Sequence, residues 1–213
     1  MFRPKGLALV IGLASAVIPS VASAQTGLVV MPIADVLRHR EAAFELELTG
    51  NERNVSKGYE YANSLTMGLF DRLEIGYESD FLGSVTANVK LLLFEDPHSL
   101  PHFALSVGAN NWRGKDVDPY AVARFDGAGY RLHAGCWRTM GSARAMFGID
   151  VPAGVGLTAS LECLCGRGGA SWAGLAYTPS FAPGFEAQIA VGIPFNHSQG
   201  LEHSFTLAYI FKL

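Results

Sequence analysis

The histidine and serine residues are the first candidates for catalysis, since acyl transfer needs a nucleophile within hydrogen-bond reach of a base. His197 and Ser198 are adjacent, and adjacent residues of an extended chain point to opposite sides. His102, His133 and His203 have no serine two positions along on the same face. We therefore predict no catalytic residues and no enzyme, with an esterase or acyltransferase acting on membrane lipid as an alternative.

The cysteines are the next candidates, because thiolates bind soft metals. Cys163 and Cys165 would share one face of a strand with Cys136 nearby, but no neighbouring histidine completes a tetrahedral ligand set. Cys136 and Cys163 fall on predicted strands separated by one other strand. That places them about 9–10 Å apart, too far for an unstrained disulfide. We predict free thiols, no metal site and no cofactor.

Paired carboxylates are the third candidates, since two of them can act as acid and base in glycoside hydrolysis. Glu45 with Glu47, and Glu74 with Glu78, have suitable spacings along the chain. Such chemistry requires a sugar-binding cleft between the carboxylates. We instead interpret them as the polar lining of a larger interior.

The elements that carry these residues have a period of two, which is typical of β-strands. Phe205, Leu207, Tyr209, Phe211 and Leu213, for example, alternate with small or polar residues and Ile210. A helix would mix these two sets on every face, whereas a strand separates them. The alternation predicts about twelve strands: 43–49, 59–69, 73–81, 84–94, 102–112, 119–126, 130–137, 144–151, 155–163, 170–178, 185–193 and 203–213.

The composition excludes several classes of protein. The chain has 213 residues, of which 49% are hydrophobic and 16% charged. Residues 1–24 have the pattern of a cleavable export signal, with a basic start, an apolar run and Ala22-Ser23-Ala24. No later run approaches the ~18 apolar residues of a transmembrane helix. No basic block suggests nucleic acid as a partner. Residues 41–213 are predicted to form one domain.

The two faces of the predicted strands differ sharply, because the apolar faces carry no charge. The opposite faces carry small residues and most of the charges. The acidic members are Glu45, Glu47, Glu60, Glu74, Glu78, Asp80, Glu162 and Glu186. The basic members are Lys90, Arg124, Arg131, His133 and Arg144.

This pattern fits either a soluble barrel with its apolar face inside or a membrane barrel with that face in lipid. Most predicted strands have 8–11 residues, close to the ~9–11 that cross a bilayer. Aromatic residues gather near strand ends, as at membrane interfaces. A ring of twelve strands has a diameter of about 24 Å, which one layer of Leu and Val cannot fill. We therefore predict an all-β, antiparallel, up-and-down transmembrane barrel, with a soluble lipocalin-like binding barrel as the alternative.

An even number of strands places both chain ends on the same side, the periplasmic side for an exported outer-membrane barrel of the Gram-negative envelope. The loops on the other side would then carry an excess of basic residues, and that excess would suit the anionic lipopolysaccharide leaflet. Scattered loop charges that merely interact with water explain it equally well. Those loops are 50–58, 82–84, 113–118, 138–143, 164–169 and 194–202.

Residues 25–40 precede the first strand and are too apolar for a free tail. Leu28 to Pro32 is an apolar run, and 34–37 could form one helical turn. One interpretation is a short element tucked against the mouth of the barrel on its periplasmic side. The other is a plug with a role in gating.

The chain's last residues, 205–213, resemble the C-terminal strand by which the assembly machinery recognises bacterial outer-membrane barrels. Three further stretches resemble the YjbH-like family of outer-membrane barrels, which is linked to exopolysaccharide loci. They are Gly27-Leu28 with Pro32 and 34–37, then 69–76, and then Glu162 with Gly166, Gly174-Leu175 and Tyr177. The resemblance implies a role in envelope polysaccharide export or transport, without implying a reaction.

Two functions remain open on the sequence. One is a narrow, weakly selective channel for polysaccharide or small polar solutes, and the other is a non-conducting structural or accessory barrel. Acidic residues come mainly from the first three strands and basic residues from the fourth to the eighth, with Asp150 the exception. Closing the sheet would place these groups on different arcs of one ring, so the electric field would run across the bore. In a closed bore, the same residues would form ion pairs around the 25–40 segment.

Overall fold

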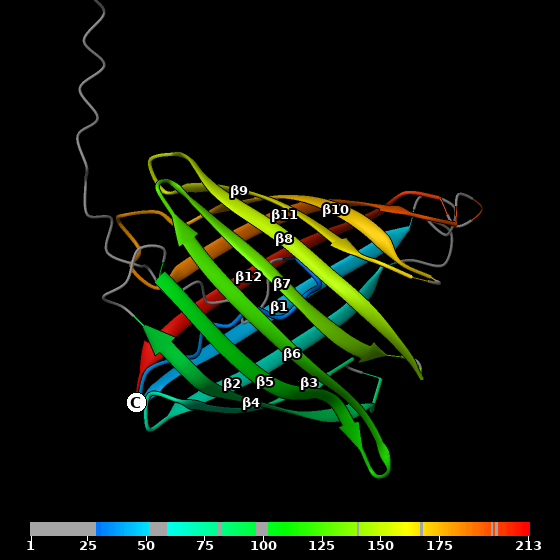
Figure 1. The fold of residues 1–213 in the computed structure, drawn as a ribbon, viewed down its shortest axis with the longest axis horizontal. Coiled ribbons are helices and arrows are strands. Elements are labelled where there is room, and N and C mark those ends of the chain that lie inside the picture. The colour runs from blue at the N-terminus through cyan, green and yellow to red at the C-terminus, as the bar shows by residue number, and fades with distance from the viewer. Residues whose placement is uncertain are drawn as a thin grey trace, which may run out of the picture.

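The computed structural model describes residues 29–51, 59–80, 82–96, 102–139, 141–166, 168–196, 198 and 200–213. Within them, each strand pairs antiparallel with its neighbours in sequence and β1 pairs with β12, so the sheet closes into a barrel (Figure 1). The strands are β1 (Glu41–Asn51), β2 (Glu60–Leu69), β3 (Leu73–Ser79), β4 (Val85–Asp96), β5 (His102–Arg113), β6 (Asp116–Gly127), β7 (Tyr130–Thr139), β8 (Ser142–Gly154), β9 (Leu157–Leu164), β10 (Ala170–Tyr177), β11 (Phe185–Pro194) and β12 (Glu202–Lys212). The predicted all-β, twelve-stranded antiparallel barrel is confirmed. Among the described residues, no helix is long and apolar enough to span a membrane.

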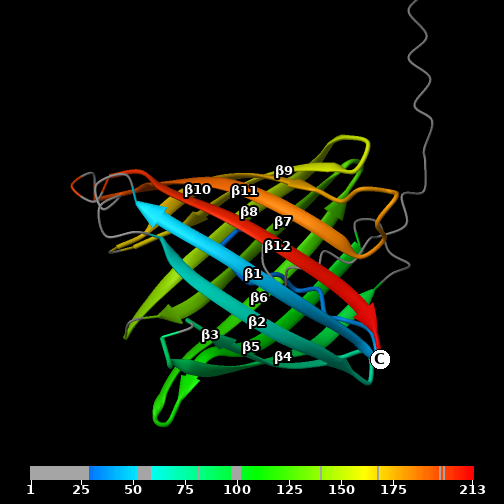
Figure 2. The same ribbon diagram turned by 180° about the vertical axis from the view of Figure 1, so that it is seen from behind.

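The barrel closes at the seam between its first and last strands, which lie side by side in Figure 2. The seam is in register from Glu41 opposite Lys212 to Asn51 opposite Glu202. Beyond β12, the Leu213 N–H donates to the carbonyl of Arg40 over 2.8 Å. Full closure leaves the sheet without an unpaired edge strand.

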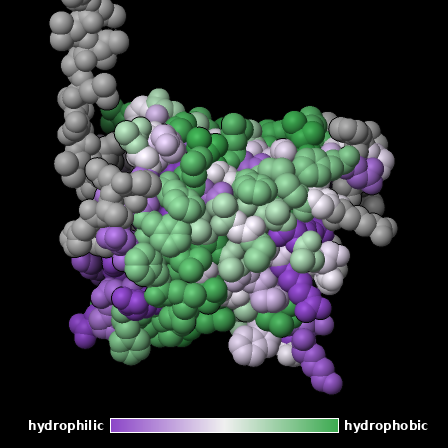
Figure 3. All heavy atoms as spheres, in the orientation of Figure 1, coloured by the Kyte–Doolittle hydropathy of each residue, from purple (hydrophilic) through white to green (hydrophobic). Residues whose placement is uncertain are grey.

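The apolar faces of the strands point outward, and the charged faces point into the lumen. Leu161 is 60% exposed whereas its neighbour Glu162 is 4% exposed, and Phe147 is 54% exposed whereas Met146 is fully buried. Hydrophobic side chains cover much of the barrel wall, and hydrophilic ones gather towards its two ends (Figure 3). A soluble barrel would show the reverse, so this is the arrangement expected of a barrel surrounded by lipid.

The two ends of the barrel differ in their connections. We call the end where β1 begins and β12 ends the terminal rim, and the opposite end the loop rim. At the terminal rim, β2 and β3 are joined by a tight turn in which Phe70 and Asp71 have φ of 56° and 57°. The ring of His39 stacks on Phe70 with centroids 5.8 Å apart, and the His39 N–H donates to Asp71 over 2.8 Å. This turn fixes the chain where it enters β1.

At the loop rim, the β5–β6 hairpin is tighter than the sequence suggested. The predicted loop 113–118 is reduced to Gly114 and Lys115, because Gly114 adopts a φ of +63° and Arg113 pairs with Asp116. Both strands therefore extend to residues that we expected to be loop. A register shift between Asn110 and Arg113 accommodates the extra length.

Candidate functional site: the barrel lumen

The lumen contains part of the chain itself. Residues Val29–Leu37, here called the lumen segment, run across the barrel interior before β1 begins. Met31, Ile33, Ala34 and Leu37 are each at most 2% exposed, and their polar partners come from strands on different sides of the ring. The described residues of this segment therefore lie inside the barrel.

One end of the lumen segment is held by a single carboxylate from β9. Glu162 accepts hydrogen bonds from the backbone N–H groups of Val30 at 2.7 Å, Val29 at 3.2 Å and Met31 at 3.3 Å. Hydrogen bonds to a charged acceptor are stronger than neutral ones, especially where water is excluded. Glu162 thus satisfies three consecutive backbone donors that would otherwise be buried without partners.

The other end of the lumen segment is held by strands on the opposite side. The Leu37 N–H donates to Glu74 Oε1 over 2.6 Å. The second oxygen of Glu74 pairs with Lys90 Nζ at 2.8 Å, and both side chains are almost fully buried. Between the two ends, the Ser106 hydroxyl donates to the carbonyl of Ala34 over 2.6 Å. The backbone of the segment is therefore tied to the wall at both ends and in the middle.

Asp35 is the only charged side chain of the lumen segment, and it meets a cluster of charges on β4 and β6. Its carboxylate forms an ion pair with the guanidinium of Arg124. Arg124 also pairs with Asp126 at 2.9 Å and with Glu95 at 3.6 Å. The guanidinium has several donors, so one buried arginine joins the segment to two acids of the wall.

A second group of charges on β7 and β8 meets the same aspartate. Arg131 Nη1 lies 3.4 Å from Asp35, and its Nε donates to Asp150 over 2.9 Å. The other carboxylate oxygen of Asp150 lies 3.4 Å from His133 Nε2. Removing Asp35 would therefore take a partner from two arginines at once.

Apolar contacts also hold the lumen segment in place. Met31 and Ile33 pack against inward side chains of β4 to β8, among them Leu92, Val122 and Met146. Close approach of the backbone also requires a glycine at one point: a Cβ at Gly68 would overlap the carbonyl oxygen of Leu37. A larger residue there would push the segment away from β2.

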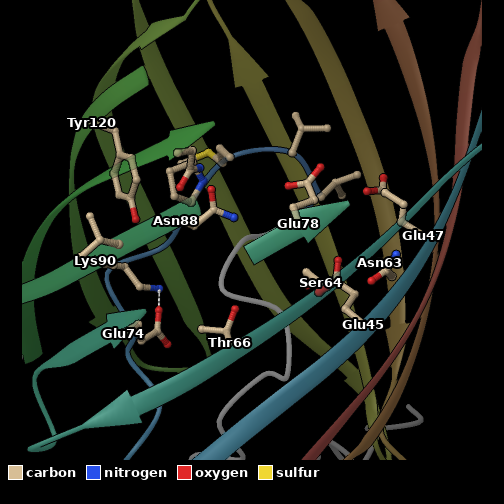
Figure 4. A pocket seen from close by; sticks show the side chains of 17 residues that line it. Glu45, Glu47, Asn63, Ser64, Thr66, Glu74, Glu78, Asn88, Lys90 and Tyr120 are labelled. Atoms are coloured by element: carbon tan, nitrogen blue, oxygen red, sulfur yellow. Dashed lines mark ion pairs between the residues drawn. The ribbon is translucent and has the colours of Figure 1, made fainter. Parts of the chain in front are cut away.

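The acidic side of the lumen differs from this packed side. Glu45, Glu47 and Glu78 point into a cavity of about 150 Å³ between β1–β6 and the lumen segment (Figure 4). Among the residues that the structure describes, no lysine, arginine or histidine lies within ion-pair distance of these three carboxylates. Glu47 accepts a hydrogen bond from the Thr49 hydroxyl over 3.1 Å. The acids thus face open space and one another rather than cations.

A larger cavity, of about 950 Å³, lies near the terminal rim on the other side of the lumen segment. Ile33 of the segment forms part of its lining. Its other lining residues come from β6 to β11 and their turns, and they include Arg131, Asp150 and Glu186. The lumen segment therefore lies between two hollow spaces.

The structure brings most of the predicted lumen residues inside the barrel but not all of them. Glu45, Glu47, Glu74, Glu78, Glu162, Glu186, Lys90, Arg124, Arg131, His133 and Arg144 are inward-facing and buried or half-buried. Glu60 and Asp80 do not belong to this group, because both are exposed at the loop rim. Asp80 instead accepts hydrogen bonds from the N–H groups of Leu82 and Ser84, each at 2.9 Å, and so shapes the β3–β4 connection.

Several functional residues were not predicted from the sequence. Asp35, Glu95 and Asp126 all take part in the ion pairs of Arg124. One available signal was Asp35 itself, a lone acid in an apolar stretch. The partners of Asp35 could not be found in this way, because they lie 89 to 96 positions further along the chain.

The candidate catalytic and metal-binding residues are scattered. His203 Nε2 lies 3.1 Å from the Tyr59 hydroxyl, and Ser198 donates to Asn196 over 2.7 Å. His197, like the export signal 1–24 and residues 25–28, lies outside the described residues. All three cysteines are free. Within the described ranges, no group of three or more His, Cys, Asp or Glu residues is placed to hold a metal ion.

Comparisons with known proteins extend only to the fold. No protein-family model and no curated protein matches the chain, so the resemblance to the YjbH-like family is not confirmed. Among solved structures, the chain is similar to a KdgM porin, with a TM-score of 0.53 and 12% identity over 79% of this chain and 99% of that one. It also matches the N-terminal β-barrel domain of Pseudomonas aeruginosa OprF, with a TM-score of 0.29 and 13% identity over 82% of this chain and 100% of that one. The first likeness shows a shared barrel fold.

Proposed function

We propose that this chain is an outer-membrane protein that conducts small polar solutes through a narrow lumen, which its own lumen segment closes at rest. Export through the signal at 1–24 would deliver it to the envelope, and its outward apolar wall would place the barrel in lipid. The C-terminal strand, with Phe205, Leu207, Tyr209, Phe211 and Leu213, would serve as the recognition element for the barrel-assembly machinery. Lipopolysaccharide would surround the loop rim.

The observation that carries this proposal is the polar character of the groups that hold the lumen segment. Glu162, Glu74 and Ser106 bind its backbone, and Arg124 and Arg131 bind Asp35. Buried ion pairs are weak evidence for stability, because a well-packed apolar replacement is often equally stable. Polar anchors have a different advantage. When the segment leaves, water can solvate them, so the lumen can exist in both a closed and an open state.

A second candidate, the non-conducting accessory barrel, is favoured by the apolar packing of Met31 and Ile33. Leu92, Val122 and Met146 face the lumen beneath these two residues. They would be exposed to water if the segment left, and this opposes opening. The two candidates therefore differ in one measurable property, the conductance after the segment is released.

Planar-bilayer recordings of the folded mature chain separate the two candidates. We expect low conductance from residues 25–213, a large steady conductance after deletion of 25–37, and intermittent opening in Asp35→Asn. Asp35→Asn alters the segment while leaving the wall intact. Asp116→Asn, the same change at the exposed loop rim, is the matched control and should behave like the wild type. Heat-modifiable gel mobility verifies that each variant is folded.

The outcome that rejects the channel is a folded deletion variant without conductance, which would leave the accessory barrel. If the deletion variant conducts, liposome-swelling rates with sugars of increasing size measure the width of the open lumen. Uptake of oligosaccharides would support the polysaccharide transport that the YjbH-like resemblance implies. Uptake restricted to monosaccharides and small polar solutes would support only the narrow channel.

A further inference from the structure

Two cysteines that the proposed function does not use lie together at the loop rim. Cys163 is the penultimate residue of β9, and Cys165 is the first residue after that strand. Their sulfur atoms are 3.5 Å apart, and both thiols are free. Glu162 points into the lumen, so its neighbour Cys163 is on the outer face of the wall. Cys165 is partly exposed and lies beyond the end of β9 at the loop rim, so a small reagent in solution can reach it.

Cys165 is linked through its backbone to a residue that lines the lumen. Its N–H donates to the carbonyl of Ala145 over 2.8 Å, which extends the β8–β9 ladder by one bond. Three residues later, the carbonyl of Gly168 accepts a hydrogen bond of 3.0 Å from Arg144 Nη1. Arg144 is buried and belongs to the inward face of β8. A displacement of Cys165 would therefore affect the hydrogen bond to Ala145 and, through the loop, the hydrogen bond of the lumen residue Arg144.

We propose that Cys163 and Cys165 are a redox-active pair that closes into a disulfide and thereby alters the loop that holds Arg144. The reaction is thiol–disulfide exchange with a small oxidised disulfide. One cysteine thiolate attacks that disulfide, forms a mixed disulfide and releases one thiolate. The second cysteine then attacks the mixed disulfide and releases the other, so the protein loses two protons and two electrons to the reagent.

The backbone geometry indicates that such a disulfide is labile rather than structural. Residues two apart in an extended strand have Cα atoms about 6.6 Å apart. This is close to the upper limit of about 6.8 Å for Cα atoms joined by a disulfide. Closure therefore pulls Cys165 towards Cys163 and weakens the bond from its N–H to Ala145. Strained, exposed disulfides are the ones that the surrounding redox potential readily opens and closes.

The third cysteine provides an internal control. Cys136 lies on β7, opposite Ala145 of β8, and the bond from Cys165 to Ala145 places Cys165 on the far side of the same residue. Two inter-strand spacings, about 9–10 Å, separate Cys136 from the pair, so it cannot join the disulfide without rearrangement of the barrel. Cys136 should therefore stay outside the disulfide when the pair is oxidised.

Thiol labelling tests the pair on the folded mature protein, whether or not the barrel conducts. After treatment with oxidised glutathione and removal of the reagent, we expect a disulfide between Cys163 and Cys165 that lowers the mass by two hydrogen atoms, while Cys136 is either labelled or carries one glutathione. Cys136→Ser should then label at no site, and Cys163→Ser should retain a reactive Cys165 or carry one glutathione there. Labelling of all three cysteines in the treated wild type, or a disulfide that includes Cys136, would overturn the proposal.

Hydrogen exchange tests the coupling to the loop. We expect at least tenfold faster exchange at the Cys165 amide in the oxidised protein than in the reduced one, because the bond to Ala145 is weakened. Peptides from the terminal rim should exchange equally in both states. Cys163→Ser should show no response to oxidised glutathione at this amide. Equal exchange in the oxidised and reduced wild type would show that the disulfide does not move the loop, and would overturn that part of the proposal.

Discussion

The charged side chains on the two sides of the lumen differ in their partners. On the side of β4 to β8, Arg124 and Arg131 are paired with acids of the wall and with Asp35 of the lumen segment. On the side of β1 to β3, Glu45, Glu47 and Glu78 face a cavity and one another. The paired side can hold the segment because its charges compensate one another when water is excluded. The carboxylates on the side of β1 to β3 have no such partners and need water to solvate them. The cavity on that side leaves room for it.

Removal of a charge should therefore have opposite consequences on the two sides. Arg124→Ala leaves Asp35, Asp126 and Glu95 without their shared cation, and breaking a buried ion pair costs about 3–5 kcal/mol. Glu45→Ala removes one of several like charges, and we expect a change within about 1 kcal/mol. Urea unfolding of both variants in lipid vesicles measures the free energies. A similar loss of stability in both would contradict the distinction between the sides.

Addition of a charge distinguishes the lumen from the outer wall on a single strand. Leu65 faces outward on β2, and an arginine facing lipid near the midplane costs about 2–4 kcal/mol. Its neighbour Ser64 lies opposite Glu45 on β1 and Glu78 on β3. Ser64→Arg should therefore be tolerated or slightly stabilising, whereas Leu65→Arg should reduce the yield of folded barrel. Equal behaviour in a folding assay would contradict the placement of this wall in lipid.

The boundary between the two sides is the pair formed by Glu74 of β3 and Lys90 of β4. Either Glu74→Gln or Lys90→Met leaves a buried charge without this partner, so each variant should be destabilised. The double variant should lose less than the sum of the two, with a coupling free energy of about 0.5–3 kcal/mol. A double-mutant cycle measured by urea unfolding tests this. Strict additivity would mean that the 2.8 Å contact contributes nothing to stability.

The smallest effect is expected from relief of repulsion on the acidic side. Glu78→Gln should stabilise the barrel by about 0.2–1 kcal/mol at low salt, because it removes one like charge from the cavity. The gain should decrease as ionic strength rises, because salt screens partly hydrated charges. Unfolding midpoints at two salt concentrations measure it. If the gain persists unchanged at high salt, repulsion is not its cause.

The wall of the barrel could be predicted from the sequence, because alternation is a local property. The outward position of Leu161 and the inward position of Glu162 follow from the period of the strand alone. The twelve strands follow from the same pattern and its interruptions. Errors fell at strand ends, where alternation stops: Glu60 and Asp80 were assigned to the lumen but lie at the loop rim.

The contents of the lumen could be predicted only in part, because they depend on contacts between distant residues. The bond from Val30 to Glu162 joins residues 132 positions apart, and no period links them. The predicted separation of acidic and basic arcs omitted Asp35, which pairs with Arg124 and Arg131. Sequence alone gave no means to choose between the mouth and the interior for residues 25–40.

The seam between β1 and β12 has a consequence for the order of assembly. It joins the first and last strands, so the ring stays open until the final residues of the chain are available. Contacts of such large sequence separation form slowly. The lumen segment immediately precedes β1, and it is enclosed by the same event. During that interval the segment can enter from the open side of the curling sheet, without threading through a finished pore. The bore would then be filled while the barrel assembles, and not by later insertion of the segment.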